Sequence, residues 1–476
     1  MSNPEHTQSV ASAVPAPAHP SQGAGTTNDI SQTRTTAPSS RTGHIGLIVV
    51  GSLATGLAAA LLLAVVVFAG AAEPVITGSA MVAFGLGWAM LAALSVWRTG
   101  QPQRWALVPG AYFTIMGAAL LLFSPGDGAL SLLGWAWPPL LLALVVWMVV
   151  HARRHLRSRT RLLVLYPVFL VLALSAAGGA FETAAESADA GQAVAGRMVD
   201  VGRHRLYLAC RGTGSPTVVL ENGFGEHTPS WAWIVKNAAR DTRVCVYDRA
   251  GQGWSDSAAG PQDGVQLATD LHTLLRRAAV PGPYVLAGHS VGGAYALTFA
   301  ARYPQQVAGM VLLDSSTPQQ FTTLPDYPAA WSSGRRLTGL LPPLARVGLL
   351  RVVPADPFDG LPPQARSQEL ALAATARERS SQRAEWAELP AAFAQAQTLT
   401  DLNGKPLIVV TAGRGQQTGW SAAQGQLARL STNSLHLTVA GAGHTALLRN
   451  EAMSANSSQA IRDVVSAIRT GTPLRA

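Results

Sequence analysis

A serine lies between two glycines in the stretch VLAGHSVGGAYAL, residues 285–297, where Ser290 follows Gly288 and precedes Gly292. A serine hydroxyl is nearly unreactive at neutral pH, and it attacks an acyl carbon only when a nearby base takes its proton. Glycines at these two positions would let the backbone approach itself in a sharp turn that presents the hydroxyl. A match this short also arises by chance, so the surrounding sequence must distinguish a nucleophile from an ordinary turn serine.

From Arg197 onward, short apolar strands alternate with amphipathic helices. Strands are predicted near residues 197–210, 217–221, 243–248, 284–289, 309–314, 406–412 and 434–440. This alternation predicts an α/β fold in which a mostly parallel sheet is covered by helices on both faces. The stretch at about 315–405 breaks the alternation and is rich in Pro, Arg and Gln, so we expect it to form a helical cap.

Ser290 therefore lies between the strand PYVLAGHS and the helix VGGAYALTFAARY, where the chain resembles the nucleophile elbow of the α/β-hydrolase superfamily. Two further stretches resemble family motifs: YDRAGQGWSD at 247–256 is similar to the turn after the fourth strand, and VAGAGH at 439–444 is similar to the loop that presents the histidine. The resemblance covers residues 197–476. It implies the α/β-hydrolase fold, with Ser290 as the nucleophile and His444 as the base.

The base also needs a carboxylate that fixes its tautomer. The family's commonest position for this acid follows the seventh strand, but no Asp or Glu occurs between Asp401 and Glu451. Some members carry the acid after the sixth strand, where this chain has Asp314 in the stretch MVLLDSS. We assign Asp314 as the orienting acid, with Asp401 as the alternative and with turn capping as the structural interpretation of Asp314.

The oxyanion that forms on attack needs fixed N–H donors. By resemblance, the donors are the backbone N–H groups of Val291, directly after the nucleophile, and of Phe224, in the loop after an early strand. Many family members have His-Gly in this loop, whereas this chain has Asn222-Gly223. A backbone donor does not depend on the side chain before it, so the oxyanion hole remains a prediction for this sequence.

Other polar residues near these motifs are assigned structural roles. We expect His289 to pack against the sheet or to line the pocket wall, and we expect Asp248, Arg249 and Asp256 to hold loops by hydrogen bonds. No metal site or cofactor is predicted, because the sequence lacks His and Cys ligand spacings and the Rossmann and Walker glycine patterns.

The chain has two cysteines, Cys210 and Cys245. In the fold that the chain resembles, the second strand lies beside the fourth, and the two cysteines fall on these strands. They are predicted to form a disulfide, which an exterior location would permit, or else to remain two buried thiols.

Five apolar segments precede this domain, each close to the ~20 residues that a helix needs to cross ~30 Å of hydrocarbon. They are predicted at roughly 45–70, 75–97, 105–124, 129–150 and 162–181. Buried helices of a soluble domain are the alternative, but such helices show a polar stripe that these segments lack. We therefore divide the chain into a disordered polar tail at 1–43, a membrane region at 44–181, a linker at 182–196 and an α/β-hydrolase domain at 197–476.

The basic residues between the apolar segments predict an orientation, because Lys and Arg remain on the cytoplasmic side. They occur before the first segment, between the second and third, and between the fourth and fifth: Arg34, Arg41, Arg98, Arg104, Arg153, Arg154, Arg157, Arg159 and Arg161. The connections AAEP at 71–74 and PGDG at 125–128 have none. Five crossings then predict an integral protein of the cell membrane with a cytoplasmic N-terminus and its C-terminal domain on the exterior side.

Three functions fit this sequence. The first is a serine hydrolase that cleaves an ester or similar acyl bond of a small or lipid-like substrate. The second is an acyltransferase with the same triad, and the third is a non-catalytic membrane protein that binds a ligand in a hydrolase-like domain. A serine nucleophile argues against the dehalogenase and epoxide hydrolase variants of the fold, which use Asp. Nucleic acid is not a predicted partner, because the basic residues behind the net charge of +9 are scattered.

Overall fold

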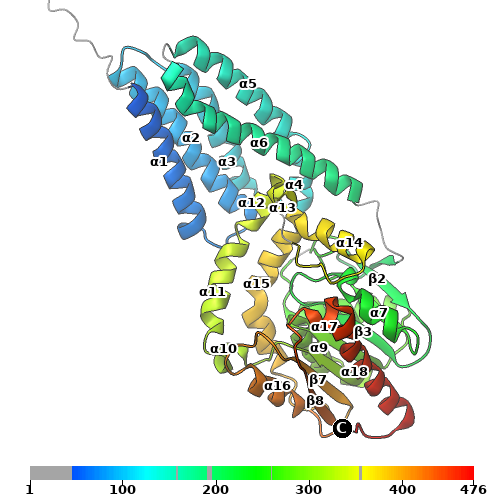
Figure 1. Cartoon of the computed structure of the whole chain (residues 1–476). Helices are drawn as coiled ribbons and strands as arrows, with labels where there is room; N and C mark the ends of the chain where they lie inside the picture. Colours follow the sequence, from blue (N-terminus) through cyan, green and yellow to red (C-terminus); the bar gives the residue numbers. More distant parts are fainter. Residues whose placement is uncertain (1–44, 157–158, 190–195, 259, 353–355, 476) are drawn as a thin grey trace, which may run out of the picture. The chain divides into compact units, whose positions relative to one another are not determined.

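The computed structural model describes residues 45–156, 159–189, 196–258, 260–352 and 356–475 (Figure 1). The tail predicted at 1–43 and residues 190–195 of the predicted linker lie outside these residues. The described chain begins with an all-helical region, which is followed from Arg197 by an eight-stranded sheet with helices on both faces. The predicted α/β class, with an all-α region before it, is confirmed.

Within the described residues, the helical region contains four stretches that are long and apolar enough to cross a membrane: Ile45–Val67, Glu73–Arg98, Arg104–Phe123 and Leu163–Asp189. Its elements are α1 (Ile45–Leu62), η1 (Leu63–Val67), α2 (Glu73–Arg98), η2 (Arg104–Ala106), α3 (Leu107–Phe123), α4 (Asp127–Leu133), α5 (Trp137–His155) and α6 (Arg159–Asp189). Helices α4 and α5 are bent by 45° at their junction, and they make a fifth candidate only if they count as one broken span.

Two predicted boundaries in this region differ from the structure. The segment predicted at 129–150 is broken, because Pro138 and Pro139 lack the N–H donors of a helix interior and are tolerated only where α5 begins. Helix α6 continues to Asp189, through residues that were predicted to belong to the linker. These residues, ETAAESAD, are mostly Ala and Glu, which favour helix.

The sheet has the strand order β1-β2-β4-β3-β5-β6-β7-β8. Its strands are β1 (Arg197–Asp200), β2 (Arg205–Arg211), β3 (Thr217–Glu221), β4 (Val244–Tyr247), β5 (Tyr284–His289), β6 (Val307–Leu313), β7 (Leu407–Ala412) and β8 (Ser434–Val439). The first predicted strand is thus a hairpin of two antiparallel strands, and β3 to β8 pair in parallel. Because parallel strands end at the same edge, the residues that follow β3, β5 and β6 meet there.

Two apolar layers cover the sheet. Helices α8 (Gly264–Arg277) and α9 (Val291–Arg302) pack on one face with a cap helix, and α7 (Ala232–Ala238) and α18 (Glu451–Thr470) pack on the other. The leucines of α8 from 267 to 275 are buried in the first layer, and Ile461, Val464 and Val465 of α18 are buried in the second. The shorter elements outside the cap are η3 (Thr228–Trp231), η4 (Pro304–Gln306), α16 (Trp420–Ala428) and α17 (Ala446–Arg449).

The insertion between β6 and β7 is helical. It contains α10 (Gln320–Thr323), α11 (Tyr327–Thr338), α12 (Leu341–Arg346), α13 (Leu349–Val352), α14 (Pro363–Ala374) and α15 (Ala376–Ala396). Phe393 on α15 lies within the apolar layer that also contains α8 and α9, so the long cap helix belongs to the core of the domain.

The cap also contacts the ends of the membrane-region helices. Arg346 of α12 pairs with Glu73 at the start of α2, with Nε and Oε1 2.5 Å apart. Arg351 of α13 pairs with Glu182 near the end of α6, at 2.6 Å. The backbone carbonyl of Gly70 accepts a hydrogen bond from Arg383 of α15 at 3.2 Å. The connection between α1 and α2, which has no basic residue, and the end of α6 therefore both contact the cap.

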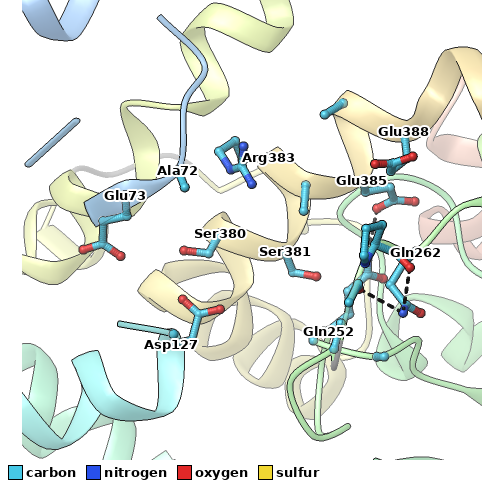
Figure 2. A pocket seen from close by; sticks show the side chains of 18 of the residues that line it. Ala72, Glu73, Asp127, Gln252, Gln262, Ser380, Ser381, Arg383, Glu385 and Glu388 are labelled. Carbon is cyan, nitrogen blue, oxygen red and sulfur yellow. Dashed lines mark hydrogen bonds between the residues drawn. The ribbon is translucent and has the colours of Figure 1, made fainter. Parts of the chain in front are cut away.

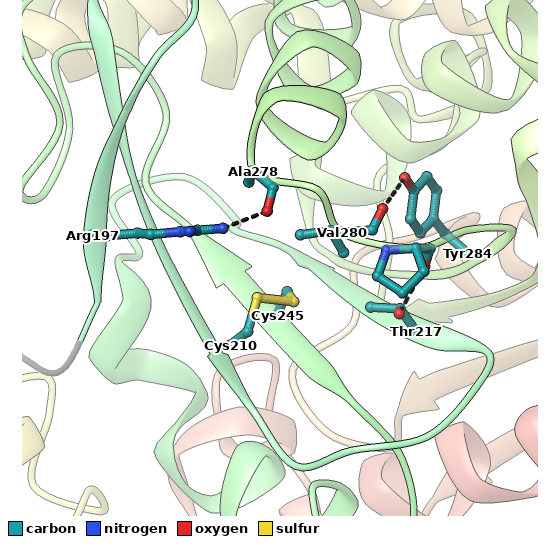
Figure 3. The surroundings of a disulfide bond; sticks show 8 residues. Arg197, Cys210, Thr217, Cys245, Ala278, Val280 and Tyr284 are labelled. Atoms are coloured by element: carbon teal, nitrogen blue, oxygen red, sulfur yellow. Dashed lines mark hydrogen bonds between the residues drawn. A yellow bond between two sulfur atoms is a disulfide. The ribbon is translucent and has the colours of Figure 1, made fainter.

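A disulfide joins Cys210 and Cys245 (Figure 3). The two residues lie directly opposite each other on the antiparallel pair β2 and β4. The bond therefore ties the antiparallel edge of the sheet to its parallel part.

Candidate active site

Ser290 occupies a strained turn between β5 and α9, with φ 56° and ψ −129°. Glycines make this turn possible: a Cβ on Gly288 would lie 2.6 Å from Cα of Gly293, and a Cβ on Gly292 would lie 2.4 Å from the carbonyl oxygen of Glu221. Both distances are shorter than real Cβ contacts. The spacing of glycines around Ser290 is therefore a steric requirement of the turn that presents its side chain.

Asp314 and His444 are brought together from the ends of β6 and β8. His444 Nδ1 lies 2.6 Å from Oδ2 of Asp314. The other carboxylate oxygen, Oδ1, accepts hydrogen bonds from the backbone N–H of Ala412 at 3.0 Å and from the indole of Trp420 at 2.8 Å. Asp314 itself has a positive φ of 41°, so its placement strains the backbone.

The electrostatics of this pair favour an ionised aspartate. Burial alone would raise the pKa of Asp314, but the hydrogen bond and charge of His444, with the donors Trp420 and Ala412, lower that pKa below its ordinary value. An ionised carboxylate only accepts hydrogen bonds, so the proton of the contact is on Nδ1 of His444. The alternative acid, Asp401, is exposed and accepts a hydrogen bond from the backbone N–H of Asn403 at 2.6 Å.

His444 lies beside the residue that precedes the serine. Its ring centroid is 4.4 Å from that of His289, and His289 Nε2 contacts the backbone carbonyl of His444 at 3.1 Å. Among the described residues, Nε2 of His444 has no hydrogen-bond partner, and the hydrogen bonds of Ser290 are made by its backbone. The geometry thus leaves the basic nitrogen and the serine hydroxyl unengaged at the same edge of the sheet.

The loop after β3 lies against the start of α9. A Cβ on Gly292 would lie 2.5 Å from the carbonyl oxygen of Asn222, so the segment that carries Phe224 adjoins the helix that begins at Val291. Among the hydrogen bonds of the described residues, none is donated by the backbone N–H of Phe224 or of Val291. Asn222, in the place of the family's histidine, holds the loop: it donates to Tyr247 O at 2.8 Å and accepts from the Trp231 indole at 2.7 Å.

Sequence reasoning missed a buried acid that contacts His289, the residue before Ser290. Glu226 Oε1 contacts His289 Nδ1 at 2.7 Å, and Glu226 Oε2 accepts from the backbone N–H of Gly223 at 2.7 Å. Burial would raise the pKa of Glu226, but His289, Arg449 and Gly223 lower it to about 2. His289, which was expected to pack or line the wall, is fully buried and links this carboxylate to the backbone of the His444 loop.

Acids of the cap are paired with buried basic residues in the segments that follow β3 and β4. His227 contacts Glu369 of α14 through Nδ1 at 2.7 Å and Glu378 of α15 through Nε2 at 2.9 Å. Arg249 donates to Glu385 of α15 at 2.7 Å and to the carbonyl of Asn222 at 2.5 Å. The only sequence signal for these contacts is the seven-residue spacing of Glu378 and Glu385, which places both on one face of a helix.

The motif residues that were assigned structural roles make structural contacts. Asp248 accepts hydrogen bonds from the backbone N–H groups of Thr228 at 2.8 Å and Trp254 at 3.0 Å, and Asp256 pairs with Arg205 at 2.9 Å. Within the described residues, no group of three His, Cys, Asp or Glu side chains could hold a metal ion.

Of the cavities lined by described residues, two that lie next to the cap are lined by neither Ser290 nor His444. The larger, about 550 Å³, separates α15 from the ends of the membrane-region helices and is lined by polar groups that include Asp127, Ser380 and Arg383 (Figure 2). The smaller, about 290 Å³, is lined by Phe224 of the loop after β3, by apolar residues such as Leu350 and Leu370, and by the polar side chains of Arg379, Gln382 and Arg449. The smaller cavity therefore adjoins the loop that carries Phe224, a predicted oxyanion donor.

Comparisons with known proteins support the fold of the C-terminal domain. Residues 216–451 match the family described as alpha/beta hydrolase fold. The chain is 35% identical over 144 residues to an uncharacterized protein of Schizosaccharomyces pombe, and the matched region covers 24% of this chain and 27% of that protein. It is 31% identical over 127 residues to Epoxide hydrolase 3 of Xenopus tropicalis, and the matched region covers 26% of this chain and 34% of that protein.

The chain thus spans about a quarter to a third of the length of these curated relatives. A solved structure of a thermophilic esterase from Thermogutta terrifontis is 22% identical, with a TM-score of 0.44, and covers 58% of this chain and 99% of that chain.

Proposed function

The C-terminal domain of this chain belongs to the α/β-hydrolase superfamily, and we propose that it makes the protein a membrane-anchored serine hydrolase that cleaves an ester or a similar acyl bond. The observation that carries the proposal is the 2.6 Å contact between His444 Nδ1 and Asp314, next to a serine in a strained turn. The His444 side chain is 42% exposed, so its second nitrogen can meet a substrate. Epoxide hydrolase 3 is a relative by sequence, but a serine at position 290 favours acyl chemistry.

The proposed reaction follows from these groups. Nε2 of His444 takes the proton of Ser290 while Oγ attacks the acyl carbon, and the carboxylate of Asp314 stabilises the imidazolium that forms. The backbone N–H groups of Val291 and Phe224 donate to the oxyanion. The alcohol leaves with the proton from His444, and water then attacks the acyl-enzyme by the same steps and regenerates Ser290.

We propose the membrane arrangement on separate grounds. If α4 and α5 form one broken span, the chain crosses five times, and the connections with arginines lie on the side opposite the hydrolase domain. The contacts of Gly70, Glu73 and Glu182 with the cap support this, because they belong to the connection without basic residues and to the end of α6. The disulfide supports an exterior location of the domain.

Two other functions remain to be compared with hydrolysis. An acyltransferase would use the same triad with an alcohol in place of water, and product analysis in the presence of excess alcohol distinguishes the two. The lack of an acid after the seventh strand favours a protein that only binds a ligand. The contact between Asp314 and His444 weakens that argument, because it supplies an acid from β6.

Labelling with a fluorophosphonate probe tests the proposal. We expect the full-length protein in detergent to be labelled, the Ser290→Ala variant to be unlabelled, and the matched variant Ser421→Ala, at an exposed serine of α16, to be labelled as the wild type is. A folded wild-type protein that takes no label, or a Ser290→Ala variant that still does, would contradict the proposal. A series of p-nitrophenyl esters of increasing chain length then defines the acyl group.

A further inference from the structure

Exposed apolar side chains of the hydrolase domain are concentrated in one part of its cap. Among the described residues from 196 to 475, the large apolar side chains that are exposed are Leu337, Leu344, Leu349, Val352 and Leu437. The first four lie within residues 337–352, which we name the cap apolar segment. Water-soluble domains seldom gather exposed apolar side chains in this way unless the surface meets a partner or a membrane.

The cap apolar segment is packed against a candidate membrane span. At Gly178 of α6 and Gly348, between α12 and α13, the two backbones are so close that a Cβ on Gly348 would lie 2.5 Å from the carbonyl oxygen of Gly178. A helix rises ~1.5 Å per residue, so a hydrocarbon layer of ~30 Å that begins at Leu163 ends near residue 183. Gly178 precedes this point, and the cap apolar segment therefore lies at the depth of the hydrocarbon boundary.

The charged groups of this segment suit such a boundary. Arg346 and Arg351 would be costly near hydrocarbon as isolated charges, but each is paired, with Glu73 and with Glu182. Arg336, the exposed residue before Leu337, remains available to the headgroup layer. The segment thus combines neutralised charges, exposed apolar side chains and a peripheral arginine, which is the pattern of a surface that rests in a bilayer interface.

Helix α13, which ends the cap apolar segment, also reaches the cavity beside Phe224. On α13, Leu349 and Val352 are exposed, whereas Leu350 between them lines the cavity of about 290 Å³. Phe224, of the loop proposed to hold the oxyanion, lines the same cavity with apolar residues such as Leu370, and the polar side chains of Arg379, Gln382 and Arg449 line the rest of it. One turn of helix therefore separates the surface beside α6 from the cavity next to the candidate oxyanion donors.

We infer that the cap apolar segment contacts lipid hydrocarbon in the exterior leaflet and admits a membrane-borne acyl chain to the cavity beside Phe224. The lipid contact rests on the membrane arrangement, and the admission of the acyl chain rests on the proposed hydrolase function. The substrate class that follows is an ester whose acyl chain is dissolved in the bilayer.

Lipid contact is tested with a fluorophore on an introduced cysteine. Both native cysteines are in the disulfide, so Val352→Cys and the control Leu437→Cys, an apolar residue of the edge strand β8, each carry one label. The full-length protein is placed in vesicles that contain lipids with a nitroxide on the acyl chain. We expect the label at position 352 to be quenched at least threefold more than the label at 437, and equal quenching at the two positions would overturn the inference.

Acyl-chain entry is tested by replacing apolar side chains with charged ones. The double variant Leu337→Glu and Val352→Glu should hydrolyse a long-chain ester in vesicles about tenfold more slowly than the wild type, because two charges weaken the apolar contact. Hydrolysis of the water-soluble p-nitrophenyl acetate should stay within twofold. The matched variant Leu437→Glu should change neither rate.

The outcomes separate this inference from the proposed function. An equal loss on both esters would indicate a purely structural role of the segment and would overturn acyl-chain entry. A wild type that hydrolyses neither ester would overturn the proposed hydrolase and acyl-chain entry with it, while the quenching experiment would still decide the lipid contact.

Discussion

Two histidine–carboxylate clusters of the hydrolase domain share a geometry and differ in their surroundings. His444 Nδ1 lies 2.6 Å from Asp314, and His227 Nδ1 lies 2.7 Å from Glu369. The His444 side chain is 42% exposed and has one nitrogen engaged, whereas the His227 side chain is fully buried and has its second nitrogen 2.9 Å from Glu378. The hydrogen-bond distance is therefore nearly the same in a candidate catalytic pair and in a pair that joins the cap to the loop after β3.

The difference lies in what each imidazole can still do. Burial would lower the pKa of His227, but Glu378 and Glu369 raise it well above the ordinary value, so this side chain is held as a cation. A cation with both nitrogens engaged cannot take a proton from a nucleophile. His444 has one carboxylate partner and an open nitrogen, and a general base needs this combination.

The largest expected effect separates the two histidines by activity. His444→Gln should lower kcat on a p-nitrophenyl ester by roughly 10⁴-fold or more, because an amide cannot accept the proton of Ser290. The melting temperature of the full-length variant should stay close to that of the wild type, since the side chain is partly exposed. A variant that keeps more than a hundredth of the wild-type kcat would show that His444 is not the base.

Replacing Asp314, the proposed orienting acid, should give the second-largest loss of activity. Asp314→Asn should lower kcat by roughly 10³- to 10⁴-fold, because an amide no longer holds Nδ1–H of His444 or stabilises the imidazolium. The matched variant Asp270→Asn removes the carboxylate of another buried pair, 3.1 Å from His204, and should leave kcat within about twofold. Equal losses in the two variants would point to a general effect of removing buried acids.

Replacing His227, which pairs with Glu369 and Glu378 of the cap, should lower the stability of the protein. His227→Gln leaves Glu369 and Glu378 buried without their cation, which should cost roughly 3–5 kcal/mol of folding free energy. The measurement is the melting temperature of the full-length protein in detergent, which should fall by several degrees. At a temperature where the variant is folded, kcat should fall by less than tenfold. An unchanged melting temperature together with a lost kcat would reverse the roles of the two histidines.

A smaller effect concerns a buried acid with no histidine. Burial raises the pKa of Glu221 from 4.5 to about 7, although Arg249 and a hydrogen bond from Tyr247 oppose the rise. The folded state thus favours the protonated carboxyl, so stability is full below about pH 4.5 and falls by up to about 3 kcal/mol as the pH rises through 7.

Glu221→Gln should remove this dependence and flatten the melting temperature between pH 5 and pH 7.5. Melting curves of the wild type and the variant across that range provide the check. Parallel slopes in the two proteins would mean that Glu221 is ionised throughout in the folded state.

Much of the candidate site could be predicted from sequence because its signals are local. The turn at Ser290 requires glycines two residues before and after it, and the apolar runs that precede Ser290 and His444 predict the strands that position them. The orienting acid was harder to predict, since Asp314 and Asp401 both lie near the ends of predicted strands. Only the folded chain places one of them 2.6 Å from His444 and the other in an exposed turn.

The cap and the membrane region were predicted less fully. Glu369 and Glu378 are separated from His227 by more than 140 residues, and no local pattern indicates which buried base an acid will meet. The break at Pro138 was visible in the sequence, but a hydropathy pattern averages over it and predicts one straight segment. The extension of α6 to Asp189 was missed for the opposite reason, because polar helix formers lower the hydropathy without ending the helix.

The sequence by itself determined the order of strands and helices, the apolar segments and the serine turn, since each depends on neighbours a few residues apart. The tertiary structure decided which acid contacts His444 and which basic residues pair with the glutamates of the cap. It also decided that residues 337–352 lie against α6. These depend on contacts between distant segments, and such contacts form only when packing of the whole chain brings the segments together.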